Sequence, residues 1–409
     1  MIAGFNIKTI DDAVIQNKRV IIRVDFNVSL SNEGQITDDT RIRQAIPTIK
    51  KLLQQQNKLI LISHLGRPKG IDPKYSLRPI IDRLTSFVSG YTVKLMTDFE
   101  SDNKQHIIAD QKKNEIILLE NIRFFKGEKE NDSGFAKKLA RMADIYVDDA
   151  FGSVHRSHAS IVGIANYIPG YAGLLLQKEI EMLSKITKNP QRPLIAILAG
   201  AKISTKIGLI SRFMKIADYI LLGGGIANTL LQVQGYQVGK SLVESTANEA
   251  AKQVLASVEN SPCKLILPLD AVCGNLQDPN IKPEVHPIAE IPSNLAIYDL
   301  GPATEIEFDK VIKQGKTIVW NGPVGLFENQ LYRHCTDTIY DSIISTENAV
   351  TIIGGGDTLV AISDKKSNDK ITHISTGGGA MLEFIEKGTL PGIDALTVSA
   401  SGLGSDRNH

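Results

Sequence analysis

PLIAILAGAKISTKIGLI, residues 193–210, begins with a continuous apolar run that ends in glycine and then changes to a segment with helical periodicity. Such a run is typical of a strand that is buried on both faces of a parallel sheet, and the change of period indicates a βα unit. Comparable runs occur along the whole chain, at 19–27, 58–64, 115–121, 143–149, 217–225, 264–270, 316–322 and 349–356. Because these runs alternate with helical segments, the sequence predicts an α/β fold with doubly wound parallel sheets.

The length of the chain predicts more than one domain, because 409 residues exceed the ~100–200 residues of a typical domain. Leu176, Ile180 and Leu183 form a helical stripe between the two groups of strands. We therefore expect two Rossmann-like domains that are joined by a helix and have a cleft between them. The expected parts are an N-terminal domain over 1–170, a linking helix over 171–188 and a C-terminal domain over 189–389. A surface helix within one domain is the alternative interpretation of the stripe.

The composition excludes several classes of protein. The chain has 46 Lys and Arg against 45 Asp and Glu and only one Trp, whereas nucleic-acid-binding proteins usually show a basic excess and stacking aromatic residues. No apolar run is long enough to span a membrane, and the three cysteines form no CxxC pair. We expect a cytoplasmic protein without nucleic-acid or membrane partners. We also expect a monomer, because no exposed apolar stripe stands out.

The strands of the first half are followed by charged, amide or imidazole side chains. These residues are Asp25, Asn27, His64, Arg67, Arg123 and Arg156, and Arg41 lies near the start of a predicted helix. Ligands of open α/β sheets bind beyond the carboxyl ends of the strands. Arginine side chains bind phosphate and carboxylate oxygens in a bidentate manner. The first half therefore predicts a site for a small, multiply anionic substrate.

The strands of the second half end in glycine instead, which lets backbone N–H groups approach a phosphate closely. Lys202 and Lys206 lie four residues apart after one of these strands, so we expect them on one face of the first helical turns. Two ammonium groups at a helix N-terminus repel each other unless an anion joins them. A polyphosphate is the expected anion, and two solvated surface lysines are the alternative.

Two further glycine-rich loops each follow a strand and begin a helix. The loop in GGGDTLVAI (354–362) puts Asp357 and Thr358 in the first helical turn, where the carboxylate can hold Mg²⁺ and the hydroxyl can contact a phosphate. The loop in STGGGAMLEFIEKG (375–388) repeats the arrangement. A single GGG is more often only a turn, but this combination favours a nucleotide site.

These loops match none of the common phosphate-binding fingerprints. There is no GxxxxGK[ST] segment and no HRD or DFG set, which excludes a protein kinase and argues against a P-loop enzyme. An NAD-dependent dehydrogenase is a weaker alternative, because GGGIAN has two of the three fingerprint glycines and Glu244 lies in a polar, helical stretch and not at a strand end. A non-catalytic nucleotide-binding protein is the other alternative.

The motifs together resemble those of the phosphoglycerate kinase family over nearly the whole chain. RVDFNV, DTRIRQAIPTI, SHLGRPKG, ENIRFFKGEKEND, DDAFGSVHRSHAS, GAKISTKI, GGGIANTLL, WNGPVGLFE, GGGDT and STGGGAMLEFIEKGTLPGIDAL occur in the order that this family shows. The resemblance implies reversible phosphoryl transfer between 1,3-bisphosphoglycerate and ADP, which gives 3-phosphoglycerate and ATP. It also implies in-line transfer with domain closure, Mg²⁺ bound with the nucleotide, and residues from about 390 to 409 packed on the N-terminal domain.

The resemblance also assigns individual residues. The 3-phosphoglycerate site would comprise Asp25, Asn27, Arg41, His64, Arg67, Arg123 and Arg156. The nucleotide site would comprise Lys206, Gly224, Asn321, Pro323, Glu328, Gly355, Gly356, Asp357 and Thr358, with Asp357 holding the Mg²⁺. Arg41 and Lys202 would act on the phosphoryl group in transfer, together with the helix start at Gly378 and Gly379.

Overall fold

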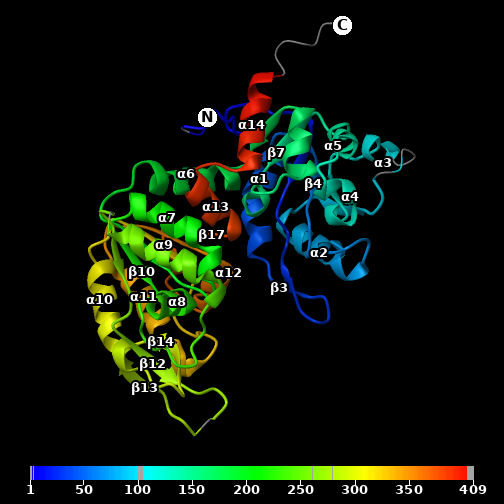
Figure 1. The fold of residues 1–409 in the computed structure, drawn as a ribbon. Helices are drawn as coiled ribbons and strands as arrows, with labels where there is room; N and C mark the ends of the chain where they lie inside the picture. The colour runs from blue at the N-terminus through cyan, green and yellow to red at the C-terminus, as the bar shows by residue number, and fades with distance from the viewer. Residues whose placement is uncertain are drawn as a thin grey trace. The chain divides into compact units, whose positions relative to one another are not determined.

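A computed structural model describes residues 2, 4–99, 101, 105–259, 261–278 and 280–402 (Figure 1). The chain divides into two compact units. The first contains the residues up to Met182 together with those from Thr389 onward, and the second runs from Leu183 to Gly388. No helix in the described part of the chain is both long and apolar enough to span a bilayer.

The first unit is built on a six-stranded sheet in which every pairing is parallel. In spatial order the strands are β5 (Thr92–Met96), β6 (Glu115–Leu119), β4 (Lys58–Ile62), β1 (Arg19–Arg23), β7 (Ile145–Asp148) and β8 (Gly170–Ala172). In β1, Val20, Ile21 and Ile22 are fully buried, as their continuous apolar run predicts. Because β4 lies on one side of β1 and β7 on the other, the strand order reverses beside β1.

Helices and short turns connect these strands. The helices are α1 (Thr40–Gln54), α2 (Arg78–Phe87), α3 (Gln105–Ala109), α4 (Lys126–Lys129) and α5 (Ser133–Ala140), and β2 (Ser29–Leu30) and β3 (Ile36–Asp38) form an antiparallel pair. The short turns are η1 (Pro73–Tyr75), η3 (Ile122–Phe124), η4 (Phe151–Ser153), η5 (Ala159–Gly163) and η6 (Ile164–Asn166).

The last helix, α14 (Pro391–Gly402), packs on the first unit (Figure 1). The Gly392 N–H donates to the carbonyl oxygen of Val154 at 2.9 Å, and Thr397 Oγ1 donates to that of Phe5 at 3.2 Å. Ile393 on this helix is fully buried. The resemblance implies that residues 403–409 pack on this unit as well, but they lie outside the described residues.

The second unit has its own six-stranded parallel sheet. In spatial order its strands are β11 (Lys264–Ile266), β10 (Tyr219–Leu222), β9 (Leu194–Leu198), β15 (Thr317–Asn321), β16 (Val350–Gly354) and β17 (His373–Ser375). This is the order of doubly wound dinucleotide-binding folds, and it reverses between β9 and β15. Two doubly wound parallel sheets confirm the predicted fold class.

The helices of the second unit are α7 (Ile207–Ile216), α8 (Gly224–Val233), α9 (Asn248–Val258), α10 (Pro302–Ile312), α11 (His334–Ser345), α12 (Gly356–Ala361) and α13 (Gly379–Lys387). Its short turns are η7 (Ile203–Thr205), η8 (Ser245–Ala247), η9 (Ile288–Glu290), η10 (Gln330–Tyr332) and η11 (Asn368–Lys370). The apolar strands of its sheet surround a core that includes the fully buried Trp320.

A small antiparallel sheet in the second unit was not predicted. It consists of β13 (Glu284–Pro287), β12 (Asp270–Gly274) and β14 (Ala296–Leu300). The single strand predicted over 264–270 is wrong, because β11 ends at Ile266 and β12 begins only at Asp270. Pro268 lies between them and has no N–H group to donate to a sheet. The strand predicted over 217–225 also ends early, since Gly224 begins α8.

Helix α6 (Leu174–Lys188) contains the divide between the two units. Leu176, Ile180 and Leu183, which form the predicted stripe, are all fully buried. The helix begins three residues later than the sequence suggested. Its first N–H groups are capped from the first unit, because Asp149 Oδ1 accepts from Leu175 N at 2.8 Å and from Leu176 N at 3.3 Å.

Candidate active site

In the first unit, the loops that follow β1 and β7 meet at the point where the strand order reverses. Asp25 follows β1 and forms an ion pair with Arg41 in the first turn of α1. Burial alone raises the pKa of Asp25, but the charges of Arg41 and Arg23 outweigh it and lower that pKa to about 2. Gly152 lies against this pair, and a Cβ atom there would collide with Asp25 Oδ2. The Asp25 carboxylate is therefore ionised at neutral pH and holds Arg41 in place.

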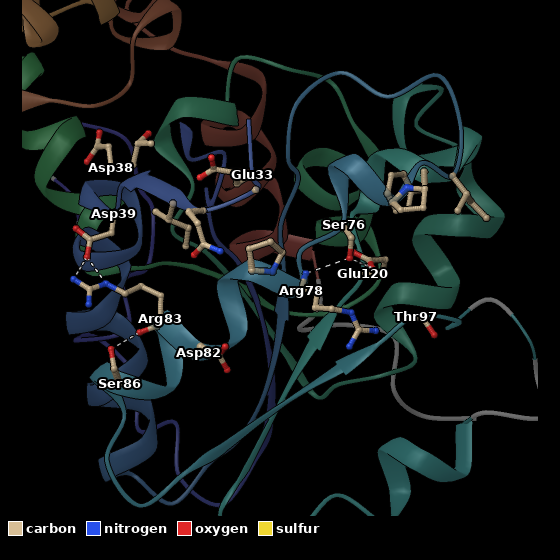
Figure 2. A pocket seen from close by; sticks show the side chains of 18 of the residues that line it. Glu33, Asp38, Asp39, Ser76, Arg78, Asp82, Arg83, Ser86, Thr97 and Glu120 are labelled. Atoms are coloured by element: carbon tan, nitrogen blue, oxygen red, sulfur yellow. Dashed lines mark hydrogen bonds and ion pairs between the residues drawn. The ribbon is translucent and has the colours of Figure 1, made fainter. Parts of the chain in front are cut away.

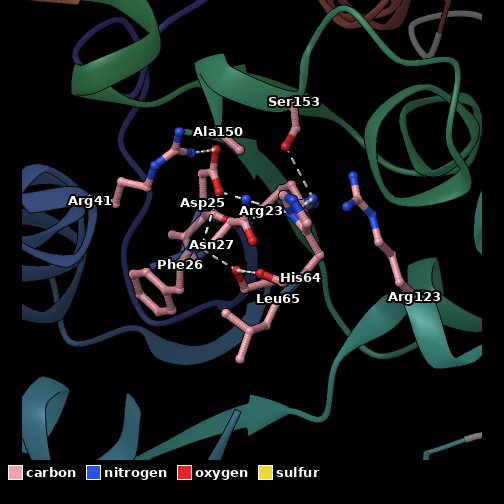
Figure 3. A network of polar contacts seen from close by, with 12 residues as sticks. Arg23, Asp25, Phe26, Asn27, Arg41, His64, Leu65, Arg123, Ala150 and Ser153 are labelled. Carbon is pink, nitrogen blue, oxygen red and sulfur yellow. Dashed lines mark hydrogen bonds and ion pairs between the residues drawn. The ribbon is translucent and has the colours of Figure 1, made fainter. Parts of the chain in front are cut away.

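His64 follows β4 and lies beside the same carboxylate, with 4% of its surface exposed. Its Nδ1 atom is 3.1 Å from Nη2 of Arg23. Burial lowers the pKa of His64 well below its usual value, and the Arg23 charge acts in the same direction. Figure 3 shows Asp25 and His64 between Arg41 on one side and Arg123 on the other. The imidazole is thus neutral among several cations.

The turn after β4 connects two more residues predicted for this site, Asn27 and Arg123. Asn27 Oδ1 accepts from the Gly66 N–H at 2.8 Å, and the Gly66 carbonyl oxygen accepts from Arg123 Nη1 at 2.6 Å. Arg67, the next residue, is exposed. Burial, together with the charges of Arg23 and Arg156, lowers the pKa of Arg123 to about 10. Such crowding of guanidinium groups favours a bound anion.

In the second unit, the residues predicted to bind a nucleotide line one cavity of about 630 Å³. They are Lys202, Lys206, Gly224, Asn321, Pro323, Glu328, Gly355, Gly356, Asp357, Thr358, Gly378 and Gly379. The cavity lies at the ends of β9 and β15, where the order of this sheet reverses. Its volume is within the range of small-molecule and cofactor sites.

Lys206 lies in the interior of this cavity. Its Nζ atom donates to the carbonyl oxygens of Ala199 and Asn321, the latter at 3.1 Å. Burial lowers the pKa of Lys206 to about 8, although the nearby Asp357 carboxylate acts in the opposite direction. A bound polyphosphate would stabilise the charged form of this amine.

Lys202 is placed differently from our expectation. The two lysines do not share the first turns of one helix, because they flank the short turn η7 and α7 begins only at Ile207. Lys202 is exposed at the cavity wall. The turn between the lysines is fixed by Glu244, which accepts from Ser204 N at 2.9 Å and from Ser204 Oγ at 2.6 Å. The sequence suggested that Glu244 lies in a helical stretch, but in the structure it precedes the short turn η8.

The glycine-rich loops after β15 and β16 are hydrogen-bonded to each other. Thr358 Oγ1 accepts from the Gly322 N–H at 2.7 Å, and Asn321 Nδ2 donates to the Gly354 carbonyl oxygen at 2.7 Å. Gly355 has φ +108°, a conformation that side chains rarely adopt, and a Cβ atom there would lie only 3.2 Å from Thr358 Oγ1. Glycine at this position therefore lets the loop present its backbone to the cavity.

Two exposed carboxylates, Asp357 and Glu328, line this cavity. No group of three or more acidic, His or Cys side chains in the described residues could hold a metal ion alone. Mg²⁺ usually binds one or two carboxylates together with substrate phosphates and water. The donor set therefore fits a Mg²⁺ ion that arrives with a nucleotide better than a permanently bound ion.

A larger hollow of about 1450 Å³ lies elsewhere in the first unit, between the segment 33–39 and helix α2 (Figure 2). Many of its acidic groups already have partners. Asp39 pairs with Arg43 and Arg83, and Glu120 accepts from Ser76 Oγ at 2.7 Å. Its lining has more acidic than basic side chains, the basic ones being Arg78 and Arg83, so we do not assign the anionic substrate to this hollow.

Comparison with known proteins agrees with this geometry. The sequence model of the family described as phosphoglycerate kinase matches residues 10–388. The chain belongs to the phosphoglycerate kinase family. It is 46% identical to a phosphoglycerate kinase of Koribacter versatilis over 95% of this chain and 98% of the relative, and 43% identical to a cytosolic phosphoglycerate kinase of Nicotiana tabacum over 96% and 98%. The structure of phosphoglycerate kinase from Coxiella burnetii matches with a TM-score of 0.86 and 39% identity, over 96% of this chain and 99% of that one.

Membership of the phosphoglycerate kinase family confirms the activity that the motifs predicted, which is phosphoryl transfer with a carboxyl group as acceptor. The dehydrogenase and the non-catalytic binding protein find no support. Glu244, which would be the acidic residue of a dinucleotide fingerprint, instead accepts hydrogen bonds from Ser204.

Part of the cavity in the second unit was not predicted from the sequence. Leu242, Ile297, Tyr298, Leu326 and Phe327 form an apolar wall in addition to the phosphate-binding loops. Ile297 and Tyr298 belong to β14, in the small sheet that the sequence did not reveal. A phosphate site is indicated by glycines and lysines, whereas an apolar surface for a planar group has no comparable local pattern.

Proposed function

We propose that the first unit binds 3-phosphoglycerate or 1,3-bisphosphoglycerate and that the second unit binds ADP or ATP with Mg²⁺. The observation that carries this proposal is the grouping of the charged residues. Arg41, His64 and Arg123 surround Asp25 in the first unit, whereas Lys206 and Asp357 face one cavity with two glycine-rich loops in the second. Each unit thus offers one anion site at the end of its parallel sheet.

In the first unit, Arg123, Arg156, Arg67 and His64 would bind the phosphate of phosphoglycerate, and Asp25 and Asn27 would accept from its hydroxyl group. Arg41 would then lie beside the carboxyl group that accepts the phosphoryl group. Because a carboxylate is already ionised at neutral pH, this reaction needs no general base. The task of the side chains is to position the reacting oxygens and to neutralise charge.

In the second unit, Lys206 and the backbone N–H groups after Gly355 and Gly378 would bind the nucleotide phosphates. Asp357 would hold Mg²⁺, and Glu328 and the apolar wall, which line the same cavity, would contact the nucleoside. When bound, the ion would neutralise part of the charge on the phosphates. Lys202 would assist the phosphoryl group during transfer. For the whole protein we propose a cytoplasmic monomer.

A coupled assay with ATP, Mg²⁺ and 3-phosphoglycerate tests this proposal, because each component can be omitted in turn. Activity should require all three components. ATP binding without turnover would instead indicate a non-catalytic nucleotide-binding protein. Stabilisation of the protein by NAD and not by ATP, measured as a rise in Tm, would indicate a dinucleotide site.

A further inference from the structure

Arg23, the last residue of β1, lies fully buried behind the predicted phosphoglycerate side chains (Figure 3). Arg23 forms no ion pair with another described residue, although only 1% of its surface is exposed. Its guanidinium group donates instead to neutral partners. These partners are Ser160 Oγ at 3.0 Å, Ser153 Oγ at 3.4 Å, the carbonyl oxygen of Val24, and His64 Nδ1 at 3.1 Å.

The contact between Arg23 and His64 determines the hydrogen-bonding state of the imidazole. A guanidinium group has only N–H donors and stays protonated in proteins. Nδ1 of His64 must therefore accept the hydrogen bond from Arg23 Nη2. A neutral imidazole whose Nδ1 accepts carries its single proton on Nε2.

The other arrangement is an imidazolium ion whose Nδ1–H donates to Asp25. His64 Nδ1 lies 3.9 Å from Asp25 Oδ1, which is too far for a hydrogen bond. That carboxylate is already used by Arg41 and by the Asn27 N–H, which donates to Oδ1 at 3.1 Å. The geometry therefore favours the neutral ring.

The charges around His64 act in the same direction. Guanidinium groups face it from three elements, namely Arg23 from β1, Arg41 from α1 and Arg123 from η3, and the Asp25 carboxylate opposes them. Burial contributes most to the low pKa of His64. A fourth cation in this place would add repulsion before any substrate arrives.

We propose that Arg23 is a positioning residue that holds His64 as a neutral imidazole with its proton on Nε2. In the described part of the chain, Nε2 has no hydrogen-bond partner and is not sealed from solvent. His64 then offers an N–H donor to an anionic substrate oxygen. The other tautomer would present a lone pair there and repel the anion. This inference rests on the proposed function, which places His64 in the phosphoglycerate site.

The inference is tested by ¹H–¹⁵N spectra that detect the ring nitrogens of histidine in the full-length protein. The His64 signals are assigned by their loss in a His64→Gln variant. In the free wild-type protein, Nδ1 should have the shift of an unprotonated acceptor and Nε2 that of a protonated nitrogen, from about pH 8 down to about pH 5. A protonated Nδ1 anywhere in this range would overturn the inference without any further variant.

An Arg23→Met variant removes the donor but keeps much of the side-chain volume. The pKa of His64 should then rise, because one of the charges that lower it is lost, and both tautomers of the neutral ring should be populated. KM for 3-phosphoglycerate should rise about tenfold or more, because the substrate loses a fixed donor, whereas KM for ATP should change little. Arg19→Met is the matched control, since Arg19 lies at the other end of the same strand and donates to the Ile108 carbonyl oxygen.

Failure of this inference can be distinguished from failure of the proposed function. If Arg23→Met folds, as judged by its melting transition, and leaves the His64 titration and tautomer unchanged, the inference is wrong. If the wild-type tautomer is as expected but 3-phosphoglycerate at saturation does not shift Nε2, His64 is not a substrate ligand. The latter outcome contradicts the proposed site and also removes the substrate role assigned here to Arg23.

Discussion

Nζ of Lys206 lies 3.1 Å from the carbonyl oxygen of Asn321, the last residue of β15, and also donates to the carbonyl oxygen of Ala199, which follows β9. These are the two strands between which the sheet order of the second unit reverses. The ammonium group is held by backbone carbonyl dipoles at this point, and no carboxylate in the described part of the chain forms an ion pair with it. A buried amine in this position remains easy to deprotonate until an anion binds.

Nucleotide affinity should therefore fall at alkaline pH. Burial lowers the pKa of Lys206 to about 8 in the free protein, and phosphates bind its charged form. Above that pH the amine must take up a proton on binding, so Kd for Mg-ADP should rise by up to about tenfold per pH unit. Lys206→Arg keeps its charge and should remove this dependence. Calorimetry in buffers of different ionisation enthalpy measures the proton uptake, and a constant Kd between about pH 7 and 9.5 would contradict the assignment.

The rate of phosphoryl transfer should depend strongly on Arg41 and Lys202. Loss of one preorganised charge at a transition state typically costs about 10²- to 10³-fold in kcat. Arg41→Ala and Lys202→Ala should lower kcat by this amount and affect KM far less. Arg43→Ala is a suitable control, because Arg43 lies on the same helix and pairs with Asp39 at 2.7 Å. A kcat within a few-fold of wild type in either variant would show that the assignment is wrong.

Asp357→Asn should weaken Mg-nucleotide binding and leave 3-phosphoglycerate affinity nearly unchanged, because Asp357 lies in the second unit and lines its cavity. We expect Kd for Mg-ATP to rise about tenfold or more. A chelator should weaken nucleotide binding to the wild type but have little further effect on the variant. Calorimetry with each ligand checks this, with Asp364→Asn as an exposed control. An equal loss for both ligands would indicate misfolding or a different metal ligand.

The two units should approach each other when both substrates are bound. The proposed arginine site and the proposed nucleotide cavity belong to different units, whereas in-line transfer requires reacting oxygens nearly in contact. Closure would also exclude water, which hydrolyses an acyl phosphate. Each substrate alone contacts mainly one unit, so only the pair should shift the equilibrium strongly. Small-angle scattering should show a smaller radius of gyration for the ternary complex than for either binary complex, and an unchanged radius with both sites filled would exclude closure.

The stability of the first unit should decrease as pH rises, owing to Asp149. Burial raises the pKa of this helix-capping carboxyl group to about 8, from 3.8 in the unfolded chain. Between these values the folded state binds more protons than the unfolded state, so the free energy of unfolding falls with increasing pH.

Asp149→Asn removes the titrating group, so the difference in Tm between about pH 5 and about pH 8 should shrink. Calorimetric melting curves measure this difference. Asp144→Asn is the control, because Asp144 accepts from Arg19 N near the protein surface. An unchanged difference in the Asp149→Asn variant would mean that another group causes the pH dependence.

The parallel sheets could be predicted from the sequence because their strands are buried on both faces. The interiors of β1, β4, β9 and β15 are short apolar runs whose residues are buried. The strands that were missed lack this pattern. In β5 the residues Thr92 and Lys94 are exposed at a sheet edge, and β13 is exposed along most of its length.

The polar residues of the site could be predicted because they follow strands directly. Asp25 and His64 closely follow the ends of β1 and β4, and Lys206 lies beyond the end of β9 after the turn η7; parallel strands bring such positions to one edge of their sheet. The role of Arg23 could not be predicted in this way. It lies within a strand, and only the folded structure shows that Ser153, Ser160 and His64 surround it.

The packing of α14 on the first unit affects the order in which the chain can fold during synthesis. The first unit needs Ile393 and the Gly392 bond to Val154, yet these residues leave the ribosome after the entire second unit. The second unit is continuous in sequence and does not need these last residues to complete its core. The segment that is made first must therefore wait, with the surface around Val154 uncovered, until nearly the last residues arrive. A released chain that ends at Gly388 should consequently contain a folded second unit and an incomplete first unit that exposes this surface.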